Sequence, residues 1–246
     1  MYVLGIESAT PVAGVAVTNN GRILAERMVN NRKTHSGHLL PMVKSVIEEA
    51  GIGPGDIDGV AVSSGPGSFT GLRIGMSTAK TLAQVWQVPV VGVSTLDALA
   101  HPLVGLANLV CPVLNARKNE VYTAVYDGAD GTMKNLTGSK ALKPGDLAAL
   151  LAGWPDRAVT FLGDGVLEYR ERLVELLGER AFFVPGAINL PRGSSVADLG
   201  WIKLEKCEGV DPLSLLPDYV RQSEAEVKWQ QKQQTTAKGC SGCSFP

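Results

Sequence analysis

A glycine-rich segment at residues 64–75, SGPGSFTGLRIG, comes nearest to a ligand-binding motif in this sequence. It lies between a predicted strand and a predicted helix, so free backbone N–H groups and the positive end of the helix dipole could hold a phosphate. The lysine of a Walker A loop is missing, and the glycine spacing is not that of a dinucleotide fingerprint. A phosphate site at Gly67 and Ser68 is therefore a hypothesis that rests on the turn alone.

The same segment begins a row of small residues. Gly67, Gly71, Gly75, Ala79 and Ala83 recur every four residues, which places them along one helix face. A glycine inside a helix costs about 1 kcal/mol relative to alanine, so close approach of another backbone is expected to offset that cost. The spacing by itself favours packing on the chain's own sheet or a neighbouring helix over contact with another subunit.

An acidic residue and two hydroxyl residues, Glu7, Ser8 and Thr10, follow the first predicted strand. In actin-like kinases this turn holds an acidic residue and a small hydroxyl residue near the phosphates and magnesium of the nucleotide. These three residues could have that role, whereas a single carboxylate at a strand end is more often structural. A ribonuclease-H-type nuclease needs a further carboxylate at the end of the fourth strand, where Ser63 and Ser64 stand instead, so nuclease chemistry is disfavoured.

Histidine and cysteine pairs are the remaining candidates for chemistry. His35 and His38 share a helix face, but a metal site normally needs a third ligand, and no acidic residue lies four positions from either one. We expect solvated or capping histidines, with a metallopeptidase site as the alternative. Cys240 and Cys243 form a single CxxC pair, which is half of a zinc site, so we expect incidental thiols there.

The elements that position these residues follow a ribonuclease-H-like order, with a three-strand meander and then helix, strand, helix and strand. The predicted ranges are 2–7, 13–18 and 22–29 for the meander, then 36–50, 57–63, 69–86 and 88–93. Asn20-Gly21 predicts a hairpin turn between the second and third strands of the meander. Shorter strands repeat the theme at 109–114, 120–126, 159–163 and 182–184, with helices at 144–151, 166–177 and 195–207.

This order predicts an α/β protein with an actin-like, duplicated ribonuclease-H-like fold. Each of two subdomains is expected to have a mixed sheet flanked by helices. The predicted boundaries are 1–106 for the N-terminal subdomain and 107–226 for the C-terminal one. Residues 227–246 are rich in Gln, Lys, Thr and Ser and are expected to form a disordered tail.

The composition is that of a globular protein, with 246 residues, 45% hydrophobic and 19% charged. A formal net charge of -1 lacks the basic surplus of proteins that grip nucleic acid by themselves, which favours a protein partner over direct RNA capture. The N-terminus has no signal-peptide pattern, and no stretch is long enough to span a bilayer. We therefore expect a cytoplasmic protein with no membrane contact.

Several motifs together resemble one family. The sequence has GIESAT at 5–10, GPGSFTGLRIG at 65–75, VGVSTLDALA at 91–100, NARKNEVY at 115–122 and PDYVR at 217–221. This set is similar to the TsaB family, also called YeaZ, and the likeness runs from residue 1 to about 228. Asn115 and Asn119 stand where Asp and Gly are common in that family.

The resemblance implies a non-catalytic dimerisation and activating subunit in tRNA modification. In the family, TsaB binds TsaD, which transfers a threonylcarbamoyl group to adenosine-37 of tRNA (t6A formation), and the ATPase TsaE docks on the pair. TsaC-type enzymes make the threonylcarbamoyl-adenylate, so TsaC is a further candidate partner. The resemblance then implies that ATP and metal are bound by the partner subunits and that this chain holds no cofactor. It also implies that tRNA is contacted through the complex and that the chain alone forms a homodimer.

The resemblance also places the TsaD contact on the two helices of the first half. The residues implied are His38, Leu39 and Met42 on the first helix, and Phe69, Leu72, Arg73, Gly75 and Met76 on the second. Two alternatives stay open. One is an actin-like ATP-dependent enzyme that uses Glu7, Ser8 and the glycine-rich turn. The other is a metal-dependent, glycopeptidase-like hydrolase.

Overall fold

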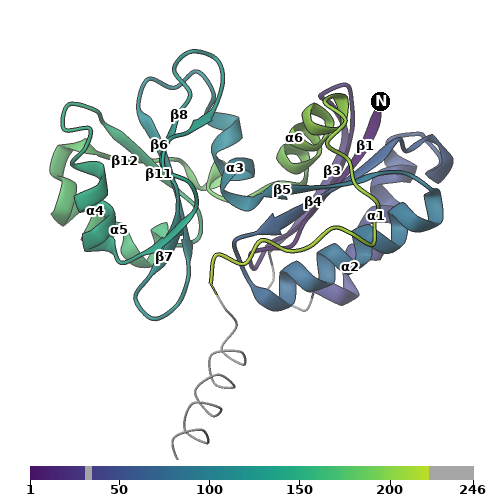
Figure 1. Ribbon diagram of the computed structural model, residues 1–246, viewed down its shortest axis with the longest axis horizontal. Coiled ribbons are helices and arrows are strands. Elements are labelled where there is room, and N and C mark those ends of the chain that lie inside the picture. Colours follow the sequence, from purple (N-terminus) through teal and green to yellow (C-terminus); the bar gives the residue numbers. More distant parts are fainter. Residues whose placement is uncertain (31–34, 222–246) are drawn as a thin grey trace, which may run out of the picture.

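The first sheet has five strands (Figure 1). The structure is a computed structural model that describes residues 1–30 and 35–221, without the side chain of His35. The order of the five strands is β3-β2-β1-β4-β5. Their bounds are β1 (Tyr2–Glu7), β2 (Ala13–Asn19), β3 (Arg22–Val29), β4 (Gly59–Gly65) and β5 (Val90–Ser94). Strands β1, β2 and β3 are antiparallel, and β4 and β5 run parallel to β1. The predicted meander and its Asn20-Gly21 turn are confirmed, since both turn residues have positive φ angles.

Two helices cover one face of this sheet. They are α1 (Leu39–Glu49), preceded by a short 3-10 turn (His35–Gly37), and α2 (Phe69–Trp86). Leu4 and Ile6 of β1 point to this face, and apolar residues of α1 and α2 join them in one buried cluster. The predicted helix at 69–86 is confirmed to the residue. A second 3-10 turn, Pro54–Asp56, lies between α1 and β4.

The second sheet has shorter strands in the order β10-β7-β6-β11-β12, with the small strand β8 paired to β6 and β9 paired to β8. The bounds are β6 (Leu109–Asn115), β7 (Val121–Thr123), β8 (Tyr126–Asp127), β9 (Lys134–Asn135), β10 (Lys140–Leu142), β11 (Val159–Leu162) and β12 (Ala181–Phe183). Helices α4 (Pro144–Leu151) and α5 (Val166–Leu177) pack on it around a separate core. The duplicated mixed-sheet architecture is therefore confirmed, although the strand predicted at 120–126 is broken into β7 and β8.

Helix α6 (Gly193–Glu205) returns to the first sheet and covers its other face. Figure 1 shows α6, in green, beside the purple and blue strands and apart from α4 and α5. A Cβ on Gly5 would lie 2.3 Å from the Gly193 carbonyl oxygen, so β1 and α6 meet backbone to backbone. The predicted boundary at 107–226 assigned this helix to the second subdomain, but its packing joins it to the first.

Helix α3 (Thr95–Ala100) and the short turn after it (His101–Leu103) connect the two lobes. Leu96, Leu99 and Ala100 pack in a cluster with residues of β6, β7 and β8. His101 Nε2 also lies 2.6 Å from Asp198 Oδ2 on α6. We use first lobe for the sheet β1–β5 with α1, α2 and α6, and second lobe for the sheet β6–β12 with α4 and α5. Within the described ranges no helix is long and apolar enough to cross a bilayer.

Candidate functional site

The carboxyl end of β1 places Glu7 at full burial, facing the side of the sheet that α6 covers. Its Oε1 accepts a hydrogen bond from Ala9 N at 2.7 Å, and its Oε2 accepts one from Ser63 Oγ. Burial raises the pKa of this carboxyl to about 7, and the charge of Asp164 adds to the rise. Both oxygens are thus engaged within the chain, which leaves the carboxyl poorly suited to hold a magnesium ion.

Ser8 connects the end of β1 to the small-residue row on α2. Its Oγ donates to the carbonyl oxygen of Gly71 at 2.9 Å. A Cβ on Gly75 would lie 2.0 Å from Ser8 Oγ, and a Cβ on Gly67 would lie 2.2 Å from the Ala9 carbonyl oxygen. The row of small residues therefore packs on the chain's own first lobe, which is the alternative that the spacing favoured.

The N-terminus of α2 is capped by groups of the same chain. Ser68 N donates to the Ala9 carbonyl oxygen at 2.7 Å, and Ser68 Oγ accepts from Gly71 N at 3.3 Å. Thr10 is buried, and its Oγ1 accepts from Val12 N at 3.3 Å. A phosphate at this turn would have to displace these contacts.

The structure brings together all five residues named for a nucleotide: Glu7, Ser8, Thr10, Gly67 and Ser68. They lie at the junction between β1, β4 and α2, called here the closed junction, where Glu7, Ser8 and Thr10 are buried and Ser68 is exposed. The side chains of Glu7, Ser8 and Ser68 bond to Ser63 and to the neighbouring backbone. This geometry gives the ATP-dependent alternative no support.

Asp164 is a residue that the sequence analysis missed. It follows β11 in the second lobe and is close enough to Glu7 to influence its pKa. Asp164 Oδ1 accepts from Asn115 N at 3.1 Å, and burial raises the pKa of Asp164. Asn189 fixes the turn by accepting from Gly163 N at 2.9 Å and donating to Gly163 O at 3.2 Å. A glycine-aspartate-glycine triplet after a predicted strand was the available signal.

The surface predicted to bind a partner is only partly at the surface. Five of its eight residues are less than a tenth exposed in the isolated chain: Leu39, Met42, Leu72, Gly75 and Met76. In the isolated chain these side chains pack beneath the helix surface, which disfavours direct contact, and the contact role predicted for these five stays a prediction. His38 and Phe69 are half-buried and Arg73 is exposed.

Other residues form the accessible face of the two helices. Leu40 on α1 is 55% exposed, and Val85 on α2 is 71% exposed. Lys44 on α1 and Ser77 and Thr81 on α2 are also exposed. We call the outer side of α1 and α2 the two-helix face.

Among the described residues, no group of three or more His, Cys, Asp or Glu is placed to hold a metal ion. His38 stands immediately before α1, where its side chain makes no capping hydrogen bond. The side chain of His35 and the pair Cys240 and Cys243 lie outside the described residues. The expected tail at 227–246 also lies outside them.

Comparison with known proteins decides the family. Residues 22–229 match the family model "TsaD: tRNA N6-adenosine threonylcarbamoyltransferase". The chain is 33% identical over 233 residues to the tRNA threonylcarbamoyladenosine biosynthesis protein TsaB of Bacillus subtilis (strain 168), a match that covers 95% of this chain and 100% of the relative. The chain belongs to the TsaB family.

Solved structures agree with this membership. YeaZ from Pseudomonas aeruginosa superposes with a TM-score of 0.76 at 29% identity, covering 89% of this chain and 99% of that one. The (R)-2-hydroxyglutaryl-CoA dehydratase component A of Acidaminococcus fermentans has a TM-score of 0.50 at 12% identity, covering 83% and 99%. The second likeness concerns the fold alone, which this TsaB family member shares with actin-like ATPases.

Proposed function

We propose that this chain is a non-catalytic, activating subunit in the formation of threonylcarbamoyladenosine on tRNA, and that it acts by binding a TsaD subunit. The B. subtilis relative carries the name of that biosynthesis, and the matched family model is that of the transferase. TsaE and TsaC are further partners in this proposal, and tRNA is reached through the complex. Such work belongs in the cytoplasm.

The closed junction is the main support for the proposal that this chain is non-catalytic. Catalysis needs groups that are free to meet a substrate or an ion and become bonded to it in the transition state. Here Glu7 is buried with both oxygens accepting hydrogen bonds, and Ser8 donates to Gly71. At the α2 N-terminus, Ser68 N donates to the Ala9 carbonyl oxygen and Ser68 Oγ accepts from Gly71 N. The turn that in actin-like kinases lies near the nucleotide is thus filled by this chain's own side chains and backbone.

The two-helix face is the proposed contact surface. It combines large exposed apolar side chains, Leu40 and Val85, with polar positions such as Ser77 and Thr81, and it stands on a rigid core of α1 and α2. A surface that mixes apolar and polar positions suits a specific protein interface, whose non-polar share is close to that of the rest of a protein surface. In the absence of TsaD, the same face pairs with a second copy of the chain.

The test is co-purification with the TsaD of the same organism, followed by a tRNA modification assay with and without this chain. Leu40→Glu and Ser77→Glu each add a charge to the two-helix face at an exposed position, so both variants should fold. We expect each to weaken TsaD binding by more than about tenfold, because desolvating an unpaired charge costs well over ~1.4 kcal/mol. Modified tRNA should fall in parallel.

Leu167→Glu is the matched control, since Leu167 is an 85% exposed leucine on α5 of the second lobe. It should bind TsaD as the wild-type chain does. Equal binding by all three variants would remove the two-helix face from the proposal. Calorimetry of the isolated chain with ATP and magnesium addresses the catalytic alternative, and a clear titration would contradict the closed junction.

A further inference from the structure

The chain after α6 forms a segment, residues 208–221 and called here the strap, that runs along the first lobe and reaches the second. Val210 makes an antiparallel backbone bridge to β5, with N–O distances of 2.9 and 3.2 Å. Lys80 Nζ on α2 donates to the carbonyl oxygens of Leu213 and Leu215 at 3.2 and 3.0 Å. The first half of the strap is therefore fixed to the first lobe, as its course in Figure 1 shows.

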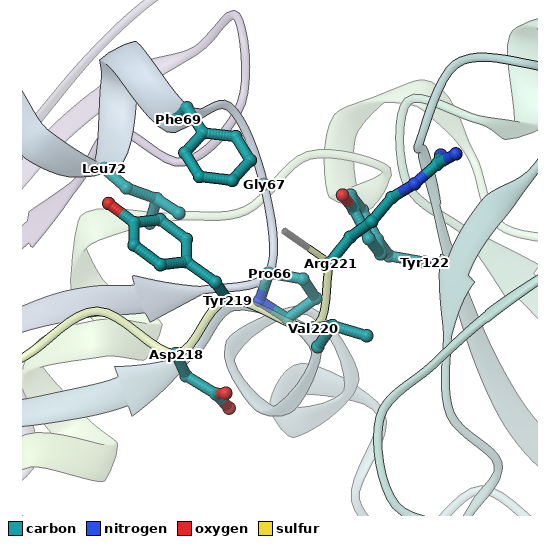
Figure 2. Close-up of a pocket in the computed structure, with 9 residues that line it drawn as sticks. All are labelled: Pro66, Gly67, Phe69, Leu72, Tyr122, Asp218, Tyr219, Val220 and Arg221. Carbon is teal, nitrogen blue, oxygen red and sulfur yellow. The ribbon is translucent and has the colours of Figure 1, made fainter. Parts of the chain in front are cut away.

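The middle of the strap covers the N-terminal turn of α2 (Figure 2). The ring of Tyr219 stacks on Phe69, with centroids 4.4 Å apart and planes 19° apart. Tyr219 Oη accepts a hydrogen bond from Arg73 Nε at 3.1 Å. Phe69 and Arg73 are among the residues named for the partner surface, so a residue 146 positions away from Arg73 holds both of them.

Close backbone contact seats the strap on the glycine-rich turn. Asp218 N donates to the carbonyl oxygen of Ser64 at 2.7 Å. A Cβ on Gly65 would lie 2.3 Å from the Asp218 carbonyl oxygen, and Gly65 has a φ of 125°, which L side chains rarely adopt. The strap thus uses the turn that the sequence had suggested for a phosphate.

The end of the strap is anchored in the second lobe. Val220 packs against the cluster of α3, β6, β7 and β8 that joins the lobes. Arg221 pairs with Glu120 at 2.9 Å and donates from Nη1 to the Ala116 carbonyl oxygen at 3.4 Å. Figure 2 shows Arg221 and Tyr122 of β7 together on the second-lobe side of this junction.

We propose that the strap is a latch that couples the second lobe to the N-terminal turn of α2, with Tyr219 as the positioning residue for Phe69 and Arg73. Releasing the second-lobe anchor then loosens a turn in the first lobe. A TsaD subunit bound at this end of α2 meets a surface whose order depends on the second lobe. That consequence rests on the proposed function, whereas the latch itself does not.

Hydrogen exchange on the full chain tests the latch directly. Arg221→Ala removes the polar contacts of the second-lobe anchor and leaves Val220 in place. We expect amide exchange at residues 65–72 to rise about fivefold, the scale set by a half-buried ion pair with a hydrogen bond. Tyr219→Ala should raise exchange at the same residues by about tenfold or more because the ring contact is lost as well. Tyr219→Phe keeps the stacking and should restore most of the protection.

Arg157→Ala is the matched control. Arg157 pairs with Asp127 at similar exposure (36% and 29%, against 32% and 26% for Arg221 and Glu120) and also donates to a backbone carbonyl, that of Ala107. Its contacts lie within the second lobe, so exchange at 65–72 should stay at the wild-type rate. Equal exchange in the Arg221→Ala and Arg157→Ala variants would overturn the latch.

TsaD affinity, measured on the same variants, tests the consequence for the partner surface. Arg221→Ala and Tyr219→Ala should weaken binding, and Arg157→Ala and Tyr219→Phe should not. If amide exchange at residues 65–72 is faster but the affinity for TsaD is unchanged, the latch does not affect TsaD binding. That result would overturn the consequence for the partner surface. If the wild-type chain binds no TsaD, the proposed function fails, and the exchange comparison still decides whether the latch exists.

Discussion

Glu7 is the residue whose environment sets a pH dependence for folding. Its pKa rises from 4.5 to about 7 on burial, so the folded chain holds a proton that the unfolded chain releases. The resulting stabilisation is complete below pH 4.5 and is lost as the pH rises through about 7. The shift corresponds to about 3 kcal/mol of unfolding free energy.

Glu7→Gln should remove this dependence, because a neutral amide can accept from Ala9 N and donate to Ser63 Oγ. We expect the variant to gain stability relative to the wild-type chain between about pH 5 and about pH 8.5, by up to about 3 kcal/mol, as measured by urea unfolding at both pH values. A difference between the two chains that does not change with pH would show that Glu7 is ionised in the folded state.

Glu26 supplies a control of opposite sign. Burial opposes ionisation there, but the hydrogen bonds from Arg192 and Ser194 outweigh it and lower the pKa of Glu26. Its contribution to stability is present above the ordinary carboxyl pKa and is lost as the pH falls. Glu26→Gln should therefore be destabilising at neutral pH, and the deficit should shrink in acid.

At the scale of the element, the position of α2 depends on close packing between its small residues and the groups beneath them. Gly75→Ala would improve helix propensity by about 1 kcal/mol, yet its Cβ would collide with Ser8 Oγ and disturb the bond from Ser8 to Gly71. We expect a net loss of about 1–3 kcal/mol in unfolding free energy, which is the usual cost of overpacking.

Gly145→Ala on α4 is the comparison for that variant. Gly145 is exposed, and among the described residues no atom outside its chain neighbours and the nearby backbone of α4 lies within 4 Å of the place that an alanine methyl would take. The substitution should therefore be neutral or slightly stabilising. If both variants gain stability, the close packing of α2 on β1 is wrong. The same geometry makes Gly75→Arg an unsuitable probe of the partner surface, because the new side chain would enter the core.

At the scale of the whole molecule, the lobes depend on segments that return from the far end of the sequence. Val3, Ala61 and Val91 on one face of the first sheet are buried against α6. A fragment of residues 1–106 would expose this apolar face, so we expect it to lack a cooperative urea transition. Joining residues 193–221 to it through a flexible linker should restore one.

A single sharp unfolding transition of the 1–106 fragment alone would contradict this dependence on α6. Comparing the two fragments also tests whether a domain is better defined by chain order or by packing. The predicted boundary follows chain order, whereas the observed lobes follow the burial of apolar faces, and these differ for α6 and for the strap (Figure 1).

The sequence alone determined the features that depend on local chemistry. Hydrophobic periodicity, the Asn20-Gly21 turn and the order of elements were enough to predict β1, α2 and the duplicated α/β architecture. Family motifs were enough to predict membership of the TsaB family. These signals are carried by neighbours in the chain, so one sequence contains them in full.

Only the tertiary structure decided which groups meet. Three contacts join segments that are distant in the sequence: Ser8 with Gly71, Tyr219 with Phe69, and Asp164 with Glu7. The local sequence pattern does not predict such contacts. The side of α2 that faces its own sheet was likewise fixed by packing, and five predicted contact residues of α1 and α2 are buried in the isolated chain. Burial and long-range pairing are properties of the assembled fold. They decide whether the polar groups at the end of β1 are free to react or are bonded within the chain.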